Sequence, residues 1–292
     1  MRVKGNRMPG IRILHEDLDV IVVEKAAGVL SQELRHSDNP SVEGMLTDYV
    51  RKGQWKSSKR VYLVHRLDRE TSGVMMVVKS ERVQQWMRDH WNEITTKTYL
   101  ARVEGELDAE RGVFESYLRE DENFFVKSVK NIKYGKFART EWKKVPSSKF
   151  QVPGSKFQVS GSRFQVSGSR FQVQGSKFKV QRSRSQAPKP VPLNPEPGTL
   201  NLEPGTLNSE LGTLNSDSTL VEVVLKSGRK NQIRVHFSEA GHPVVGDAKY
   251  GHGHRGDTLC LHAWKLSFKH PHTGKILSFE TEPPAFAGNM VK

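Results

Sequence analysis

The sequence predicts an α+β fold, in which helices flank a mixed, mostly antiparallel sheet. Short segments with the apolar or alternating patterns typical of strands outnumber the helical segments. Strands and helices also lack the regular alternation that is expected of a parallel α/β fold. Near the end of the chain, residues 259–268 and 276–280 read as an antiparallel hairpin that turns at 271–274.

The first expected elements are two short strands and a helix. Residues 11–14 and 20–24 are apolar runs on either side of a polar turn, a pattern typical of adjacent strands. Residues 39–50 show helical periodicity, with Pro40 near the start and apolar side chains on one face. The pattern therefore predicts an amphipathic helix at this position.

A polar loop separates the next two expected strands. Residues 61–64 lead into this loop, and residues 74–78, a fully apolar run, lead out of it. Residues 80–92 then read as a helix, because their apolar positions have helical spacing and Ser80 is a suitable N-cap. Strands on both sides of the loop predict that its polar side chains are held on a rigid support.

Strand patterns dominate the remainder of the predicted sheet. Residues 98–104 alternate between apolar and polar side chains. Residues 140–145 and 219–225 read as strands on either side of a long repeat. Residues 232–237, which follow a turn at 227–229, read as one more strand.

The repeat occupies residues 146–217 and has a period of seven. Its first unit begins at Ser148, Ser155, Ser162, Ser169 and Ser176, and its second unit begins at Gly198, Gly205 and Gly212. Eight of the chain's 14 prolines lie here, and the segment has no Trp, Tyr, Met, His or Cys. This composition predicts a low-complexity insertion that is disordered, with a catalytic domain formed by residues 1–145 and 218–292.

Two origins of the insertion remain open. One codon choice for Val-Gln-Gly-Ser-Arg has a reverse complement that encodes Pro-Gly-Thr-Leu-Asn, the sequence of residues 197–201. The two repeat units are therefore compatible with the translated arms of an inverted DNA repeat, which a surface loop tolerates at little entropic cost. The alternative is an RNA-binding arm, since the segment has nine basic and four acidic residues.

The charge of the chain predicts a polyanionic partner. Its 46 Lys and Arg exceed its 32 Asp and Glu, for a net charge of +14, of which +9 lies outside the insertion. Nucleic acid is the commonest polyanion for such a protein. The single Cys260 excludes a disulfide framework, and no apolar run has the length of about 20 residues that spans a membrane. The start of the chain lacks the apolar stretch of a signal peptide, so we expect a cytoplasmic protein without a membrane association.

The densest polar cluster is His-Arg-Leu-Asp-Arg-Glu-Thr-Ser-Gly at residues 65–73, in the loop between two predicted strands. Such loops often carry catalytic groups. From spacing alone, a solvated turn in which Gly73 relaxes the backbone is the favoured interpretation. The histidines at 252, 254, 262, 270 and 272 do not match a closed zinc pattern, so we expect no metal.

Residues 64–73 resemble the signature of the RluA-type pseudouridine synthases. Similar motifs of that family follow in the same order at residues 97–105, 228–236, 241–251 and 261–271. Together the resemblance covers about residues 11–145 and 218–284. It implies a single catalytic domain with a central cleft, and an isomerase that needs no cofactor because the reaction neither adds nor removes atoms.

The resemblance also implies the roles of individual residues. Asp68 becomes the catalytic aspartate, which attacks the substrate covalently or assists elimination at the sugar. Arg234 becomes its ion-pair partner, which favours the ionised carboxylate and lowers its pKa. Tyr99 is expected to stack on the uracil. Without the resemblance, Arg234 reads as a surface arginine and Tyr99 as a core aromatic. We assign contacts with RNA to Arg66, Arg69, Arg229 and Lys230.

Two departures from the family pattern and one missing part qualify the resemblance. Asn231 stands where a histidine is usual, and Ala26 stands where a proline is common. The chain is expected to be a short form without the N-terminal RNA-binding domain. The expected substrate is a uridine in a loop or bulge of ribosomal or transfer RNA, since a target base must leave its stack.

We expect a monomer with no obligate protein partner. The alternative function is an RNA-binding chaperone or ribosome-assembly factor that keeps the fold but has little catalytic activity. The presence of Asp68, Tyr99 and Arg234 favours the enzyme.

Overall fold

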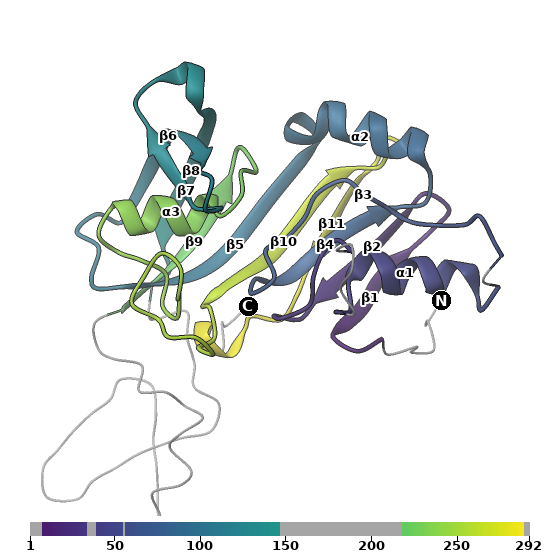
Figure 1. The fold of residues 1–292 in the computed structure, drawn as a ribbon, viewed down its shortest axis with the longest axis horizontal. Coiled ribbons are helices and arrows are strands. Elements are labelled where there is room, and N and C mark those ends of the chain that lie inside the picture. The colour runs from purple at the N-terminus through teal and green to yellow at the C-terminus, as the bar shows by residue number, and fades with distance from the viewer. Residues whose placement is uncertain (1–7, 34–38, 55, 147–217, 289–292) are drawn as a thin grey trace, which may run out of the picture. The chain divides into compact units, whose positions relative to one another are not determined.

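The computed structural model describes residues 8–33, 39–54, 56–146 and 218–288. In these residues, eleven strands form one sheet with the order β1-β2-β4-β10-β5-β9-β8-β6-β7, while β3 pairs with β4 and β11 pairs with β10 (Figure 1). Neighbouring strands are antiparallel, except that β4 and β10 are parallel. The predicted α+β class and the mixed, mostly antiparallel sheet are therefore confirmed.

The strands occupy most of the described chain. They are β1 Ile11–Glu16, β2 Val20–Lys25, β3 Tyr62–Leu63, β4 Ser72–Val78, β5 Thr95–Glu104, β6 Arg111–Glu120, β7 Val126–Val129, β8 Lys136–Lys144, β9 Ser218–Leu225, β10 Leu261–Lys269 and β11 Ile276–Glu280. The helices are α1 Val42–Arg51, α2 Glu81–Ile94 and α3 Gln232–Glu239, with short 3-10 turns η1 Ile132–Tyr134 and η3 Ala285–Ala287. No helix among these described segments is both long and apolar enough to cross a membrane.

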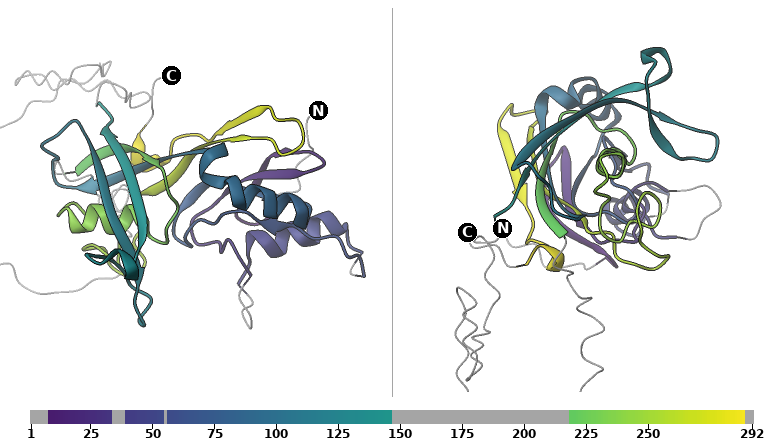
Figure 2. Two further views of the ribbon diagram at one scale, coloured as in Figure 1. Left: turned by 90° about the horizontal axis from the view of Figure 1, so that it is seen from above. Right: turned by 90° about the vertical axis from the view of Figure 1, so that its left-hand side faces the viewer.

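Both faces of β2 and β4 are buried. Successive side chains of a strand point to opposite faces, and Ile21 packs in one apolar cluster while Val22 packs in another. Leu46 of α1 belongs to the first cluster and Met87 of α2 belongs to the second. Figure 1 shows these two helices beside β1–β4, and both views of Figure 2 show α3 beside β6–β8. Ser80 caps α2 as predicted, with its hydroxyl accepting the N–H of Val83.

The parallel contact between β4 and β10 depends on a glycine. Gly73 has a φ of +116°, and a Cβ at this position would lie 2.1 Å from the carbonyl oxygen of Ala263. That distance is far shorter than any van der Waals contact, and both atoms belong to paired strands. The last residue of the polar cluster is therefore fixed by close strand packing as well as by its backbone conformation.

We expect Gly73→Ala to lower the free energy of unfolding by about 3 kcal/mol, because strained backbone and overpacking add at this position. Urea denaturation followed by circular dichroism measures the effect. Gly228→Ala is the matched control, since a Cβ at that position has no neighbour within 4 Å. Equal midpoints for the two variants would contradict the packing argument.

The strand predicted at residues 232–237 is wrong, because this segment is the helix α3. Ile233 and Phe237, one helical turn apart, pack in the main core, while Val235 packs in a separate cluster with β6, β7 and β8. The helix is buried on more than one side, so apolar residues alternate with polar ones along its sequence. That alternation is typical of a strand and concealed the helical period.

Strands β6 and β7 were not predicted from the sequence. Most side chains of β6 are exposed or half-buried, and β7 has only four residues. Their position in the sheet explains why they are so little buried, because β7 is the edge strand and β6 lies next to it. Strands near an edge bury few side chains, so they lack the apolar runs that marked the interior strands.

The insertion lies between two neighbouring strands. β8 and β9 pair antiparallel, with Thr140 opposite Leu225 and Lys144 opposite Val221. The strands predicted at 140–145 and 219–225 are thereby confirmed. Residues 147–217, which hold nearly all of the predicted disordered repeat, lie outside the described residues.

Candidate active site

Asp68 lies in the loop between β3 and β4, and its two neighbours in the chain are anchored. Ser31 Oγ donates to the carbonyl oxygen of Leu67 at 2.6 Å and accepts the N–H of Leu67 at 3.0 Å. On the other side, the carbonyl oxygen of Arg69 accepts a hydrogen bond from Lys25 Nζ at 3.1 Å. The backbone is therefore fixed immediately before and after Asp68, which restricts where its carboxylate points.

Lys25 is a buried anchor of this loop. Its ammonium donates to three carbonyl oxygens, those of Ala26 at 3.0 Å, Val29 at 2.8 Å and Arg69. Burial lowers the pKa of Lys25 to about 8. Ala26, which departs from the family pattern, donates its own N–H to the carbonyl oxygen of Gly10 at 2.8 Å, a bond that a proline could not make.

The Asp68 side chain is 23 % exposed and lines a cavity of about 520 Å³, including the open mouth. The cavity receives residues from the β3–β4 loop, β5, the end of β9, the 228–231 turn and the first turn of α3. Its polar lining residues are Arg66, Asp68, Thr71, Tyr99, Arg229, Lys230, Asn231, Gln232 and Arg234. The structure thus brings together segments that lie far apart in the sequence.

Arg234 is shared by three carboxylates. Its Nε and Nη2 donate to the two oxygens of Asp247, each at 2.7 Å. Its Nη1 lies 3.8 Å from Asp68 Oδ2 and 3.7 Å from Glu70 Oε2. The Arg234 side chain is only 6 % exposed and Asp247 is fully buried. The bidentate pair with Asp247 therefore fixes the guanidinium plane, and the remaining nitrogen faces Asp68.

Arg234 lowers the pKa of Asp68 as expected, but the pKa of this carboxyl still lies above its ordinary value. Burial raises the pKa of Asp68, and the lowering effect of Arg234 does not outweigh it. The geometry explains this, because the direct hydrogen bonds of Arg234 go to Asp247 and Glu70 competes for the remaining charge. Asp68 is consequently a more basic carboxylate than one in water, which increases its reactivity as a base or nucleophile when it is ionised.

Asp247 is a site residue to which the sequence assigned no role, although it lies within the matched motif at 241–251. Burial would raise its pKa, but the hydrogen bonds from Arg234 and from the N–H groups of Tyr250 and Lys249 lower it overall. It therefore stays ionised as the counter-ion of Arg234. Only the fold could reveal this, because α3 and the 246–251 loop meet in space through the hydrogen bonds between Arg234 and Asp247.

Tyr99 lies on β5 and is buried at the cavity wall. Burial raises the pKa of its phenol, so the side chain is neutral at physiological pH. A neutral aromatic ring at the wall of a cavity provides a surface on which a planar base can stack.

The other predicted RNA contacts divide into two groups. Arg66, Arg229 and Lys230 line the cavity. Arg69 does not line it, because its side chain turns outward and Nε donates to the carbonyl oxygen of Gly28 at 3.3 Å.

Asn231, which replaces the usual histidine, begins α3. Its φ of 54° and ψ of 19° are left-handed, a conformation that asparagine tolerates well. Its Nδ2 donates to the hydroxyl of Tyr250 at 2.9 Å, and its Oδ1 lies 3.5 Å from Arg234 Nη1. Asn231 therefore supplies polar contacts beside Arg234.

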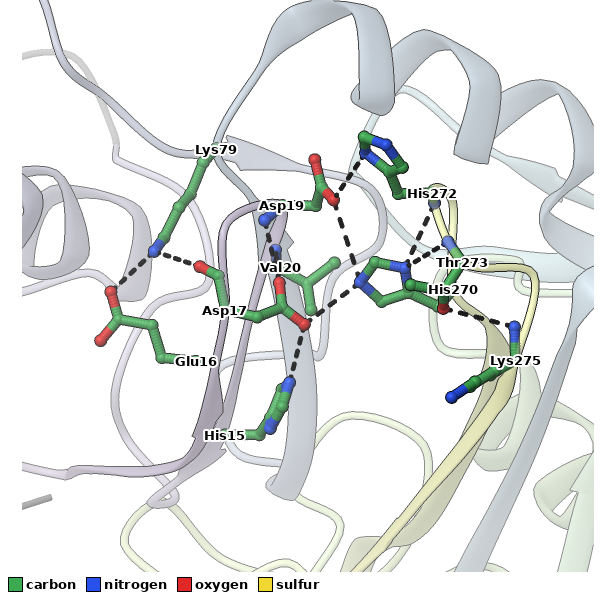
Figure 3. Close-up of polar contacts among 10 residues, drawn as sticks. All are labelled: His15, Glu16, Asp17, Asp19, Val20, Lys79, His270, His272, Thr273 and Lys275. Atoms are coloured by element: carbon green, nitrogen blue, oxygen red, sulfur yellow. Dashed lines mark hydrogen bonds and ion pairs between the residues drawn. The ribbon is translucent and has the colours of Figure 1, made fainter. Parts of the chain in front are cut away.

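A second polar cluster joins the β1–β2 turn to the β10–β11 turn (Figure 3). Asp17 Oδ2 lies 2.8 Å from His15 Nε2 and 3.1 Å from His270 Nε2, while His272 Nδ1 lies 3.4 Å from Asp19 Oδ2. Ligand atoms of Asp17, Asp19 and His270 lie within 4.8 Å of one another, close enough to surround a metal ion. None of these residues lines the cavity at Asp68.

The hydrogen bonds of His270 argue against metal binding by this cluster. Its Nδ1 accepts the backbone N–H groups of His272 at 3.2 Å and Thr273 at 3.1 Å. A ring whose Nδ1 accepts must carry its proton on Nε2, which is the nitrogen that faces Asp17. A protonated nitrogen cannot ligate a metal, so the cluster acts as a hydrogen-bonded link between two turns.

The cavity thus combines an anchored carboxylate, a fixed guanidinium beside it, an aromatic wall and several basic residues. A family model described as RNA pseudouridylate synthase matches residues 19–239. The chain is 26 % identical over 284 residues to the uncharacterized RNA pseudouridine synthase YlyB of Bacillus subtilis, and the alignment covers 96 % of this chain and 71 % of that protein. It is 25 % identical to the dual-specificity RNA pseudouridine synthase RluA of Yersinia pestis, with coverage of 92 % and 98 %.

A solved structure has the same fold. The human protein "RNA Pseudouridylate Synthase Domain Containing 4" superposes with a TM-score of 0.56 at 19 % identity, and the match covers 94 % of this chain and 89 % of that one. The chain belongs to the RNA pseudouridylate synthase family. It is an isomerase that converts uridine to pseudouridine in RNA, and its predicted resemblance to the RluA type is confirmed.

Proposed function

We propose that this enzyme modifies a uridine of ribosomal or transfer RNA, in the cytoplasm and as a monomer, and that Asp68 is the catalytic carboxylate. The observation that carries the proposal is the position of Asp68, anchored on both sides and facing Arg234 in a cavity walled by Tyr99. The names of two relatives support this choice of RNA. RluA of Yersinia pestis is named a dual-specificity RNA pseudouridine synthase. A protein of Neisseria meningitidis, which is 43 % identical over 77 residues, is named ribosomal large subunit pseudouridine synthase D.

The reaction needs one carboxylate and controlled movement of the base. The bond between uracil N1 and ribose C1′ breaks, the base turns, and C1′ bonds to C5. The C5 proton is lost to a base and N1 gains a proton, so no atom is added overall. Asp68 attacks the substrate covalently or assists elimination at the sugar, and either route needs its ionised form beside the flipped nucleotide.

The surrounding residues have complementary roles in this proposal. Arg234 orients Asp68 and stabilises its negative charge, and Asp247 holds Arg234 in place. Tyr99 stacks on the uracil. Arg66, Arg229 and Lys230 contact phosphates near the cavity mouth, whereas Arg69, which faces outward, contacts RNA away from the cavity. Phosphate contacts would make the affinity for RNA depend on salt.

The proposed substrate is tested by mapping pseudouridines in total RNA from cells with and without the gene. At least one uridine of ribosomal or transfer RNA should be modified only when the gene is present. A plasmid copy of the gene should restore it. Identical maps in both strains would overturn the proposal that either RNA class is the substrate.

We also propose that residues 146–217 are dispensable for catalysis. The support is the direct antiparallel pairing of β8 with β9, whose ends a short turn could join. We expect a chain with 146–217 replaced by a four-residue Gly-Ser turn to melt cooperatively and to retain turnover of the full chain's RNA substrate. A non-cooperative transition, or loss of turnover in a folded variant, would contradict this, and differential scanning calorimetry with a turnover assay measures both.

A further inference from the structure

A second cavity, of about 1550 Å³ including its open mouth, adjoins the cavity at Asp68. It extends from the β3–β4 loop along α2 and β5. Both cavities share Arg66, Tyr99, Leu225, Gly228 and Arg229 as lining residues. We call the second cavity the α2 groove. Because the two cavities share these lining residues, an extended strand with one nucleotide at Asp68 would place its neighbouring nucleotides at the α2 groove.

The α2 groove has the charge of a binding surface for a polyanion. Its cationic lining residues are Arg60, Arg66, Arg88, Lys97 and Arg229. Its carboxylates are Glu43 and Glu81, and Glu43 lies 3.8 Å from Arg60 in an ion pair. The cations therefore outnumber the carboxylates, and among the described residues of the groove only Arg60 has a carboxylate partner.

Lys97 is the unusual member of this set, because it is only 5 % exposed. Its ammonium has one hydrogen bond, to Asn92 Oδ1 at 3.3 Å. Within the described part of the chain, no carboxylate lies within ion-pair distance of it. Burial lowers the pKa of Lys97 to about 8, and the nearby Arg229 contributes in the same direction. A buried cation without a counter-ion is costly, so an anion that enters the groove would relieve this cost.

The position of Lys97 relates it directly to the proposed uridine pocket. Lys97 and Tyr99 are two residues apart on β5, so both side chains lie on the same face of the strand, about 6.7 Å apart along it. Tyr99 lines both cavities, and Lys97 lines the α2 groove. The Lys97 ammonium lies 5.9 Å from the centroid of the Trp91 ring, which itself stacks on His65 at 4.7 Å between centroids.

We propose that Lys97 is a phosphate-binding residue, which binds a backbone phosphate of the RNA strand next to the isomerised uridine. The assignment rests on the proposed function, since it takes Tyr99 as the wall against which that uridine stacks. Arg66 and Arg229, which line both cavities, bind the same stretch of backbone from the groove mouth. Trp91 provides an aromatic surface in the groove for an adjoining base.

The test measures binding of a fluorescent oligouridylate to the full chain between about 50 and 200 mM salt. For Lys97→Met we expect about tenfold weaker binding, since one charge-assisted hydrogen bond is lost. The slope of log affinity against log salt should fall by about 0.7, the value for one phosphate contact on a single strand. Lys97→Arg, which keeps the cation, should restore most of the slope.

Lys265→Met is the matched control. Lys265 lies on β10, the strand next to β5, but its ammonium is paired with Glu280 at 3.2 Å and it does not line the groove. We expect this variant to bind as the unmodified protein does. If Lys97→Met also keeps the original affinity and salt slope, or if Lys265→Met loses as much, the proposal is overturned.

Oligouridylates with a single neutral methylphosphonate provide a second arm, in which one phosphate charge of the RNA is removed. In the unmodified protein, one position of the substitution should lower the salt slope by about 0.7. In Lys97→Met, that position should lose its effect. Equal effects in both proteins would show that another residue binds the phosphate. These measurements report binding alone, so their failure is separable from that of the proposed function, which is read from pseudouridine maps.

Discussion

Asp68→Asn is expected to lower the rate of pseudouridine formation by roughly 10⁴-fold or more. Among the described residues, Asp68 is the only carboxylate that lines the cavity. RNA affinity should change little, since phosphate contacts come from other residues. The variant should also fold. Within the described residues, the Asp68 side chain accepts no hydrogen bond, and Arg234 keeps its pair with Asp247.

The direction of the pKa shift adds an expectation about stability. The pKa of Asp68 is raised in the folded protein, so the folded state binds the proton more tightly than the unfolded state does. Stability is then lost as pH rises from the unfolded pKa through the folded pKa. Asp68→Asn removes this loss, and we expect its stability at neutral pH to equal or exceed that of the unmodified protein.

Turnover is measured by release of tritium from RNA labelled at uracil C5, because the C5 proton leaves in the reaction. Glu70→Gln is the matched control, since Glu70 also faces Arg234 but its side chain is 53 % exposed. We expect it to retain activity within about tenfold, as a partly exposed neighbour rather than the reacting group. Full activity of Asp68→Asn would refute the assignment of Asp68 as the catalytic carboxylate.

Arg234→Lys is expected to lower turnover by at least about 10²-fold, with RNA affinity nearly unchanged. A lysine keeps the charge but cannot donate two parallel hydrogen bonds to Asp247 while a third nitrogen faces Asp68. Misplacement of a catalytic group by about 1 Å is sufficient for a loss of this size. Tritium release and oligouridylate binding measure the two quantities. An equal loss in both would indicate a phosphate contact instead.

Arg234→Ala should have an additional structural effect. It leaves the fully buried Asp247 without its cation, which lowers the free energy of unfolding by about 3–5 kcal/mol. For the turnover of Arg234→Lys, the matched control is Arg102→Lys. Arg102 is half-buried, and its Nε donates to the carbonyl oxygen of Phe286, away from the cavity. Its turnover should stay close to that of the unmodified protein. Stability of Arg234→Ala equal to that of the unmodified protein would contradict the bidentate pair.

Local sequence patterns predicted those elements whose burial is one-sided or complete. The apolar run at 74–78, the capped helix after Ser80 and the hairpin at 259–280 appear in the structure as β4, α2 and β10–β11. The patterns failed at α3, which is buried on several sides, and at β7, the edge strand, and its neighbour β6. In these three elements, the neighbouring elements in the fold determine which side chains are buried, and local sequence does not show which elements those are.

The motifs also predicted most of the cavity wall, because Asp68, Tyr99, Arg234 and three of the four basic residues line it. They did not reveal that Arg234 is held by Asp247, or that Lys97 is buried without a counter-ion. Each of these facts depends on the distance between side chains from separate segments. The number of residues between two motifs does not give the distance between their side chains in the fold.

The sequence by itself determined the α+β class, the division of the chain by the repeat, and the family, since these follow from hydrophobic period, composition and ordered motifs. The tertiary structure decided the electrostatics of the site. Removal of Asp68 from water raises its pKa, while the strongest bonds of Arg234 go to Asp247. Desolvation and Coulomb energy depend on how segments from four parts of the chain pack around one carboxylate.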